Sequence, residues 1–322
     1  MSLDVTRLEK VRRNPTGKIT ARCPACAEDG GDRTGNHLVI FPDEKFACAA
    51  RAGDGDHRKR IMALVGIPSE GTFDAEQRRQ WWKEKNATRQ RSLGKDRLAR
   101  SARHHRQELI RQFGWLHEEV WDDSPQRIDC DLVAMDPAHF LSSLFSPHDL
   151  LWTGEVHQSG GDSHAVRWKT CAEWIATGTR IGPMTTPAVW MPGTISRASN
   201  NVLKSPYVVL DFDGFDGIKP VTPDELSRHL LDSLAIVRWL REAMAWQLAA
   251  ILWTGGKSLH AWFHTPPPEV LKSLLPVATP LGMDAGLIGR PEHPCRLPGQ
   301  VHQGSGKVSR VLWVQELENS AR

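Results

Sequence analysis

The sequence has no long hydrophobic run. No stretch approaches the ~20 consecutive apolar residues that a membrane-spanning helix needs. The first ten residues carry charges with no apolar run behind them, which does not fit a secretory signal. From these absences we expect a cytoplasmic protein that does not associate with a membrane.

The sequence also lacks internal repeats, low-complexity tracts and a complete Gly-x-x-x-x-Gly-Lys-Ser/Thr phosphate-binding loop. The segment from Thr254 to Ser258 ends in Gly-Gly-Lys-Ser, but it has no earlier glycine and is predicted to form a hairpin turn. A fused helicase or ATPase is therefore not expected, and a helicase would have to come from another chain.

The composition is that of an ordinary globular protein, with 322 residues of which 40% are hydrophobic and 25% are charged. This length allows two domains, or one domain with an appendage. The formal net charge is only +3, and by itself it says little about partners. Its distribution along the chain says more.

Positive charge gathers between residues 78 and 111, where acids are few and proline is absent. We predict a basic helical connector, which is either a solvated helix or a surface that follows the phosphates of nucleic acid. Trp81, Trp82, His104 and His105 can add base stacking, or they can dock the connector on a domain. The basic residues are Arg78, Arg79, Lys83, Lys85, Arg89, Arg91, Lys95, Arg97, Arg100, Arg103, Arg106 and Arg111.

Three of the six cysteines are clustered. Cys23, Cys26 and Cys48, together with His57, have the spacing of a zinc ribbon in which two knuckles close on one ion. A module of about 45 residues with little core would need that metal to fold. His37 is the alternative to His57 as fourth ligand. A redox Cys-x-x-Cys fits less well, because no βαβ pattern surrounds it.

The remaining cysteines are Cys130, Cys171 and Cys295. We expect them to be small buried residues in a reducing compartment.

Two carboxylates follow an apolar run in the segment 208–213. Asp211 and Asp213 stand at positions i and i+2, so on a strand they point to the same face and can hold a divalent cation. The alternative is a turn or cap pair, since aspartate often bonds its own backbone at a strand end.

A second polar segment follows about forty residues later. Gly255 and Gly256 let the backbone approach a ligand closely, and Lys257 offers a point charge. Ser258 and His260 share one face of the next predicted strand. Each segment is a weak signal alone, but two such segments on neighbouring strands suit a metal ion and a nucleoside triphosphate.

The chain divides into a zinc ribbon at 1–68, the connector at 69–112 and a mixed α/β region at 113–322. We predict helices at 57–65 and 223–246, a glycine- and serine-rich turn at 159–163 and a loop at 182–205. The predicted strands lie at 149–153, 207–213, 249–254, 258–263 and 310–314.

Four motifs, in this order along the chain, resemble those of the archaeo-eukaryotic primase superfamily, especially the primase-polymerases of phages, plasmids and integrated elements. The resemblance covers about residues 113–322, and the zinc segment is similar to the ribbon that precedes such domains and bacterial-type primases. The motifs are Asp211-Phe212-Asp213, Gly255-Gly256-Lys257-Ser258-Leu259-His260, Asp284 and Arg296-Leu297-Pro298-Gly299.

The resemblance implies an α/β (α+β) catalytic domain with an RRM-like antiparallel sheet beside a smaller α/β lobe, and a cleft for template and nucleotide. Asp211, Asp213 and Asp284 would hold two catalytic Mg²⁺ or Mn²⁺ ions. His260, Ser258 and Lys257 would contact the phosphates of the incoming nucleotide, as would Arg296. Asp284 has the alternative of a helix cap or loop acid, and Arg296 that of a structural ion-pair partner.

The activity implied is that of a template-dependent DNA primase or primase-polymerase of a mobile element. Its partners would be single-stranded DNA, NTP or dNTP, and a separate replicative helicase. Two alternatives are a zinc-containing nucleic-acid-binding module that has lost catalysis, and a nucleotidyltransferase accessory to repair.

Overall fold

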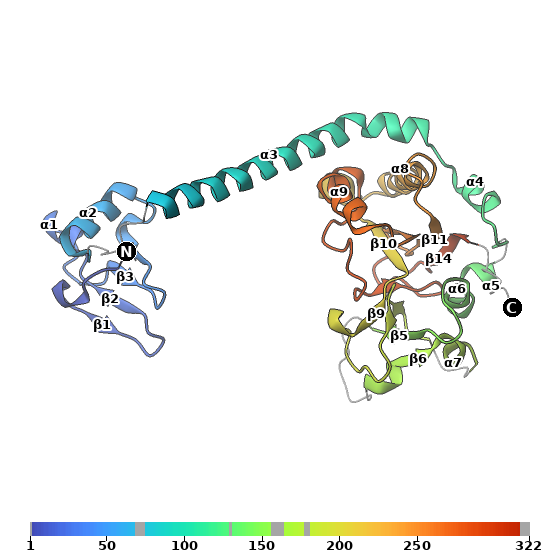
Figure 1. The fold of residues 1–322 in the computed structure, drawn as a ribbon, viewed down its shortest axis with the longest axis horizontal. Helices are drawn as coiled ribbons and strands as arrows, with labels where there is room; N and C mark the ends of the chain where they lie inside the picture. Colours follow the sequence, from blue (N-terminus) through green and yellow to red (C-terminus); the bar gives the residue numbers. More distant parts are fainter. Residues whose placement is uncertain (1, 68–74, 129–130, 156–163, 177–180, 316–322) are drawn as a thin grey trace. The chain divides into compact units, whose positions relative to one another are not determined.

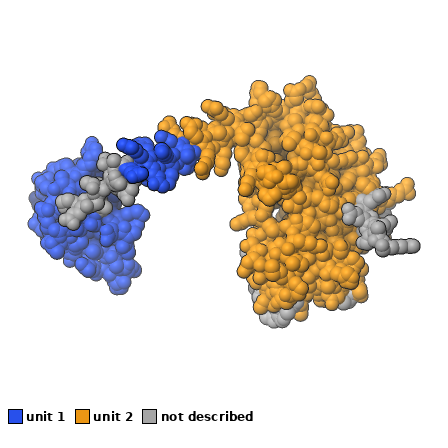
Figure 2. All heavy atoms as spheres, viewed as in Figure 1, with its two compact units in different colours: residues 1–88 blue, residues 89–322 orange. Residues whose placement is uncertain are grey.

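The computed structural model describes residues 2–67, 75–128, 131–155, 164–176 and 181–315. The turn predicted at 159–163 and Cys130 lie outside these ranges. The chain forms two compact units, residues 1–88 and 89–322 (Figure 2). This division falls inside the predicted connector, which forms helix α3 (Ala75–Gln112).

The amino-terminal unit is built on a small antiparallel sheet with strand order β1-β2-β3-β4 (Figure 1). Its strands are β1 (Arg12–Arg13), β2 (Ile19–Ala21), β3 (Leu38–Ile40) and β4 (Phe46–Cys48). Two helices, α1 (Pro24–Glu28) and α2 (Gly55–Val65), complete the unit. Asp54 caps α2 by accepting hydrogen bonds from two backbone N–H groups, and Gly66 follows its last residue, so the short helix predicted here is confirmed.

Helix α3 is almost wholly exposed until its last turns. There Ala102, Leu109 and Ile110 pack against the core of the carboxy-terminal unit. Arg103 and Arg106 both form ion pairs with Asp216, at 2.5 and 2.8 Å. The end of α3 is therefore part of the carboxy-terminal unit, and two of its arginines hold it there through ion pairs.

The central sheet of the carboxy-terminal unit has the strand order β10-β12-β11-β14, and every neighbouring pair is antiparallel. Helix α8 (Pro223–Glu242) links β10 to β11, and β12 lies between them. Thr222 and Glu225 form a capping box at the start of α8. The strands are β10 (Tyr207–Phe212), β11 (Leu248–Trp253), β12 (Leu259–His264) and β14 (Arg310–Val314). The four strands predicted here are confirmed to within two residues at each end.

Both faces of this sheet are buried (Figure 1). Val208, Leu210 and Phe212 pack against α8 and α9 (Pro268–Ala278). Tyr207 and Val209 point to the other face, as period-2 alternation requires, and pack against α6 (Pro137–Leu144) and the second sheet. The sheet thus lies between a helical layer and a second lobe.

The second lobe contains an antiparallel sheet with strand order β13-β7-β5-β6 and a separate β8-β9 ladder. Its strands are β5 (Leu150–Gly154), β6 (Trp168–Thr170), β7 (Met184–Thr185), β8 (Val189–Trp190), β9 (Val202–Lys204) and β13 (Cys295–Arg296). Helix α7 (Cys171–Ala176) contacts β6, whereas α4 (His117–Asp122) and α5 (Asp131–Ala134) contact β14 of the central sheet. The loop predicted at 182–205 is therefore wrong in part, because strands of two or three residues are too short to show an alternating pattern.

The mixed α+β class and its antiparallel sheets confirm the coarse prediction, while the RRM-like fold itself stays a prediction. Cys171 and Cys295 are buried, as expected. Within the described ranges, no helix combines the length and the apolar character that crossing a membrane requires.

Candidate functional site

Four buried side chains of the amino-terminal unit converge on one point. The ligand atoms of Cys23, Cys26, Cys48 and His57 all lie within 4.8 Å of one another. The Sγ atoms of Cys26 and Cys48 are 3.6 Å apart, and His57 Nε2 lies 3.3 and 3.5 Å from the Sγ atoms of Cys23 and Cys26. A zinc tetrahedron has edges of about 3.8 Å between sulfurs and about 3.6 Å between sulfur and nitrogen. These four residues can hold a metal ion, and zinc fits.

Helix α2 decides which histidine joins this cluster. Asp54 fixes the first turn of α2 by accepting a hydrogen bond from the His57 backbone N–H at 3.0 Å, and this turn carries the His57 ring to the thiols. His37 instead lies with its Nε2 3.9 Å from Asp32 Oδ1 and stands outside the cluster. Burial and the neighbouring thiols raise the pKa of Cys26 to about 12, so zinc binding must displace a proton.

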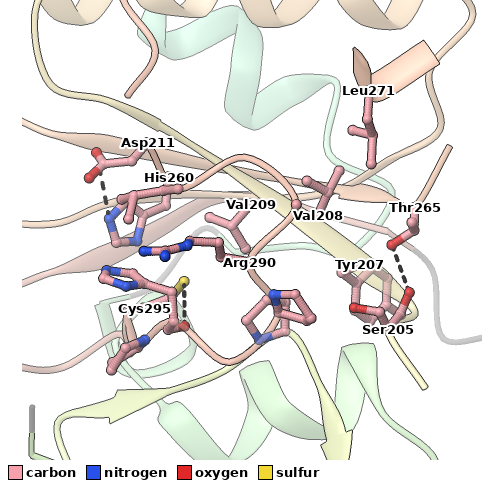
Figure 3. A pocket seen from close by; sticks show the side chains of 16 residues that line it. Ser205, Tyr207, Val208, Val209, Asp211, His260, Thr265, Leu271, Arg290 and Cys295 are labelled. Atoms are coloured by element: carbon pink, nitrogen blue, oxygen red, sulfur yellow. Dashed lines mark hydrogen bonds and ion pairs between the residues drawn. The ribbon is translucent and has the colours of Figure 1, made fainter. Parts of the chain in front are cut away.

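A second group of polar residues lies where two strands of the central sheet stop being apolar. Asp211 of β10 stands directly opposite His260 of β12 in the antiparallel register. Along β10 it continues the row of Tyr207 and Val209, and along β12 His260 continues the row of Trp262. Both side chains therefore face the second lobe, and Asp211 Oδ1 lies 3.8 Å from His260 Nε2 (Figure 3).

Asp211 is held in an unfavourable electrostatic setting. Burial, followed by the negative charges of Asp213 and Asp284, raises its pKa to about 7, although a hydrogen bond with Ser258 opposes the shift. Oδ1 of Asp211 and Oδ1 of Asp213 are buried without a hydrogen-bond partner among the described residues. Buried carboxylate oxygens that accept no hydrogen bond and lie close to other acids are a setting that a bound cation would relieve.

Two lysines compensate the charge of Asp213. Lys219 Nζ lies 2.6 Å from one carboxylate oxygen, and Lys257 Nζ lies 3.5 Å from the other. Lys257 was predicted to contact phosphate, whereas Lys219 follows β10 in a loop and had no distinguishing sequence signal. The ion pairs place both cations beside the predicted metal ligands.

Asp284 is near Asp211 but is not buried with it. Its backbone N–H donates to the Asp211 carbonyl at 2.8 Å, and its Oδ1 accepts from the Gly286 N–H at 2.8 Å. Within the described ranges, only the cysteine and histidine cluster brings three or more ligand atoms within 4.8 Å of one another. The three acids are neighbours without forming a closed ligand set, and the carboxylate of Asp284 acts partly as a loop acid.

His260 lines a cavity of about 210 Å³ between the central sheet and the second lobe, together with Asp211, Arg290, His293 and Cys295 (Figure 3). Burial, and then the positive charge of Arg296, lowers the pKa of His260 to about 3. The imidazole is therefore neutral near pH 7, and it can donate one hydrogen bond without carrying a charge.

Arg290 lines this cavity, and Arg296 follows the lining residue Cys295 in β13. Arg296 is half-buried, and no carboxylate within the described ranges forms an ion pair with it, so its alternative role as a structural ion-pair partner is not observed. Arg290 also has no ion-pair partner among the described residues, and it lines the same cavity as His260 (Figure 3). Arg290 and His293 were not predicted, although the prolines that flank them, in the loop directly before Arg296, are a signal that could have found them.

The two glycines of the hairpin turn are required by the packing of the turn. Gly255 has a φ of +81°, and a Cβ on it would lie 2.7 Å from the Lys307 carbonyl oxygen. A Cβ on Gly256 would lie 2.6 Å from Nε2 of His302. The loop 302–307 fills the space that a side chain would take, so both positions need glycine, and their contact with a nucleotide stays a prediction.

Comparisons with known proteins give no independent name for this arrangement. No protein-family model, no curated protein and no solved structure matches the chain.

Proposed function

We propose that the chain is a template-dependent DNA primase or primase-polymerase that makes short primers on single-stranded DNA during replication of a mobile element in the cytoplasm. The observation that carries the proposal is the pairing of Asp211 with His260 across adjacent strands, at the wall of a cavity lined with arginine. Acids that can hold cations, with positive side chains nearby, suit nucleotidyl transfer, in which a 3′-hydroxyl attacks the α-phosphate of a nucleoside triphosphate and pyrophosphate leaves.

Asp211, Asp213 and Asp284 are the residues that would hold Mg²⁺ or Mn²⁺. The buried Oδ1 atoms of the first two accept no hydrogen bond from the described residues, which fits such an ion. When bound, two such cations lower the pKa of a 3′-hydroxyl and stabilise the leaving pyrophosphate.

The chain's own residues would bind and orient the triphosphate. Neutral His260 donates an N–H to a phosphate oxygen, and Arg296 supplies a charge that no described carboxylate neutralises. Lys257 can turn from Asp213 to a phosphate, because Lys219 is the closer partner of that carboxylate. His260 is buried, so the exclusion of water strengthens its interaction with a phosphate.

The amino-terminal unit and α3 would hold the template. Zinc is the ion proposed for the cysteine and histidine cluster, because the ligand distances suit it. The central arginines of α3, which are Arg89, Arg91, Arg97 and Arg100, are exposed and have no carboxylate partner among the described residues. They would follow the phosphates of the strand, while a separate helicase opens the duplex.

One observation favours a second candidate, a nucleic-acid-binding module without catalysis. Lys219 and Lys257 already neutralise Asp213, so in that alternative the ion pairs are the resting arrangement of a site that takes no cation. A nucleotidyltransferase accessory to repair is the other alternative, and it would extend a primer without starting one.

Primer synthesis separates these candidates. The purified chain is incubated with single-stranded DNA, Mg²⁺ or Mn²⁺, and labelled NTPs or dNTPs. Asp211→Ala and Asp213→Ala should each abolish synthesis, whereas His260→Ala should raise the KM for nucleotide by about 10- to 150-fold, because a hydrogen bond to a charged group contributes about 1.5 to 3 kcal/mol. Asp122→Ala, which removes an exposed carboxylate of α4, is the control. Normal synthesis by the Asp211→Ala and Asp213→Ala double variant would leave the binding module as the better interpretation.

A further inference from the structure

A second, larger cavity lies beside the Gly255–Lys257 turn. It is a groove of about 720 Å³, bounded by this turn, the first turns of α8 and the loop 302–307. Trp253, Lys257, His302, Ser305, Lys307 and Arg310 are among the residues that line it. None of the described lining residues is acidic. Of this set, only Lys257 takes part in the proposed binding of the triphosphate.

Of the three cations that line the groove, one has no carboxylate partner among the described residues and two form ion pairs. Lys307 has no carboxylate partner among the described residues, and its Nζ lies 5.5 Å from the centre of the Trp253 ring. Lys257 is the more distant of the two cations beside Asp213. Arg310 pairs at 3.1 Å with Asp131, whose side chain is 69% exposed, and such an exposed pair is easily exchanged for another anion.

The walls of the groove are fixed by direct hydrogen bonds. The backbone N–H of His302 donates to the Lys307 carbonyl at 2.8 Å, which closes the loop. Ser305 Oγ donates to the Gly255 carbonyl at 2.6 Å, which ties the loop to the turn. The indole N–H of Trp253 donates to the Gly256 carbonyl at 3.0 Å, and this bond sets the orientation of the ring. The cations and the aromatic ring therefore stand in place before any ligand arrives.

We propose that this groove binds a single strand of nucleic acid, with its phosphates on Lys307 and Lys257 and a base against Trp253. Charge complementarity selects a polyanion, and an aromatic face beside a lysine selects one whose bases are open for stacking. A duplex hides its bases, so a single strand is the occupant that uses both features. The inference rests on the proposed function only where it identifies this strand as the template. The template would then pass beside Asp213, because Lys257 lines the groove and also lies next to Asp213.

The test measures binding of a labelled oligodeoxythymidylate of about 16 nucleotides. Binding is monitored by fluorescence anisotropy without added Mg²⁺, Mn²⁺ or nucleotide. Lys307→Gln should raise Kd about 5-fold near 0.1 M salt and lower the salt slope by about 0.7, the contribution of one neutralised phosphate on a single strand. Trp253→Leu should raise Kd by about 5- to 150-fold with an unchanged slope, because stacking is not ionic. Lys272→Gln, in an exposed lysine of α9, is the matched control and should change neither quantity.

Each outcome decides the proposal. A Kd and slope for Lys307→Gln equal to those of Lys272→Gln would overturn it, even if Trp253→Leu failed to fold. Displacement of the oligonucleotide by ATP from the wild-type chain, but not from Lys307→Gln, would also overturn it, because the groove would then take free triphosphates. Since the assay requires no synthesis, loss of the proposed enzymatic function would leave its result intact.

Discussion

Replacing Asp211 by asparagine should stabilise the metal-free carboxy-terminal unit, and the gain should depend on pH. The change keeps the shape of the side chain and removes the charge that Asp213 and Asp284 repel. The pKa of Asp211 is raised from 3.8 to about 7 in the folded chain, and its side chain is only 19% exposed. At about 1.4 kcal/mol per pKa unit, a shift of this size corresponds to about 4 kcal/mol of destabilisation by the ionised carboxylate.

The sign follows from linkage. Below about pH 4 the carboxyl is protonated in both the folded and the unfolded chain, so Asp211 does not lower the free energy of unfolding there. Between about pH 4 and pH 7 the unfolded chain ionises first, and the wild type loses stability; above pH 7 the full cost is present. Asp211→Asn should therefore be about 2 to 4 kcal/mol more stable than wild type at pH 8 and equal to it near pH 4.

Urea unfolding followed by tryptophan fluorescence measures this difference. No tryptophan precedes Trp81, and Trp81 and Trp82 are exposed, so the signal reports mainly the carboxy-terminal unit. Added Mg²⁺ or Mn²⁺ at about 100 times its Kd should stabilise the wild type by about 2.7 kcal/mol and leave Asp211→Asn unchanged. Asp122→Asn, in an exposed carboxylate, should match wild type at every pH. A variant no more stable than wild type at pH 8 would refute the electrostatic interpretation of the site.

Two further predictions concern the amino-terminal half of the chain. The purified protein should contain one zinc per chain by elemental analysis; Cys48→Ser should lose it and His37→Ala should keep it, while loss of zinc from His37→Ala alone would contradict the assignment of His57. Replacing the central arginines of α3 by glutamine should weaken single-strand binding and lower the salt slope by about 0.7 for each phosphate that is no longer neutralised, and an unchanged slope would make α3 a solvated helix.

Much of the fold could be predicted from local pattern. The strands around Asp211 and His260 are continuous apolar runs bounded by turns. Such runs can be recognised in the sequence without knowing which strands they pair with. Helix α8 is marked by Thr222 and Glu225 at its start, a capping pair that acts within one turn. The short strands β7, β8 and β9 were missed. A segment of two or three residues becomes a strand only because it pairs with a partner strand, and its own sequence does not show that partner.

The candidate site was predicted by type more than by arrangement. Period-2 spacing predicts that Asp211 and Asp213 share one face, but it gives no register with β12, and β10 ends at Phe212, before Asp213. Asp216 lies only three residues after Asp213, yet its carboxylate anchors α3 through Arg103 and Arg106. This pairing spans more than a hundred residues, so no local signal could have shown it.

The sequence by itself determined the elements and the chemistry: a cysteine and histidine metal cluster, a basic helix, and acids and cations at the ends of buried strands. Such features depend on residue type and on spacing within a few positions, and both are independent of how the chain folds in three dimensions. Only the tertiary structure decided the rest. It paired Lys219 with Asp213, filled the space over Gly255 and Gly256 with the loop 302–307, and raised the pKa of Asp211. Each of these depends on groups distant in sequence that meet in a medium from which water is excluded, where burial and nearby charge dominate.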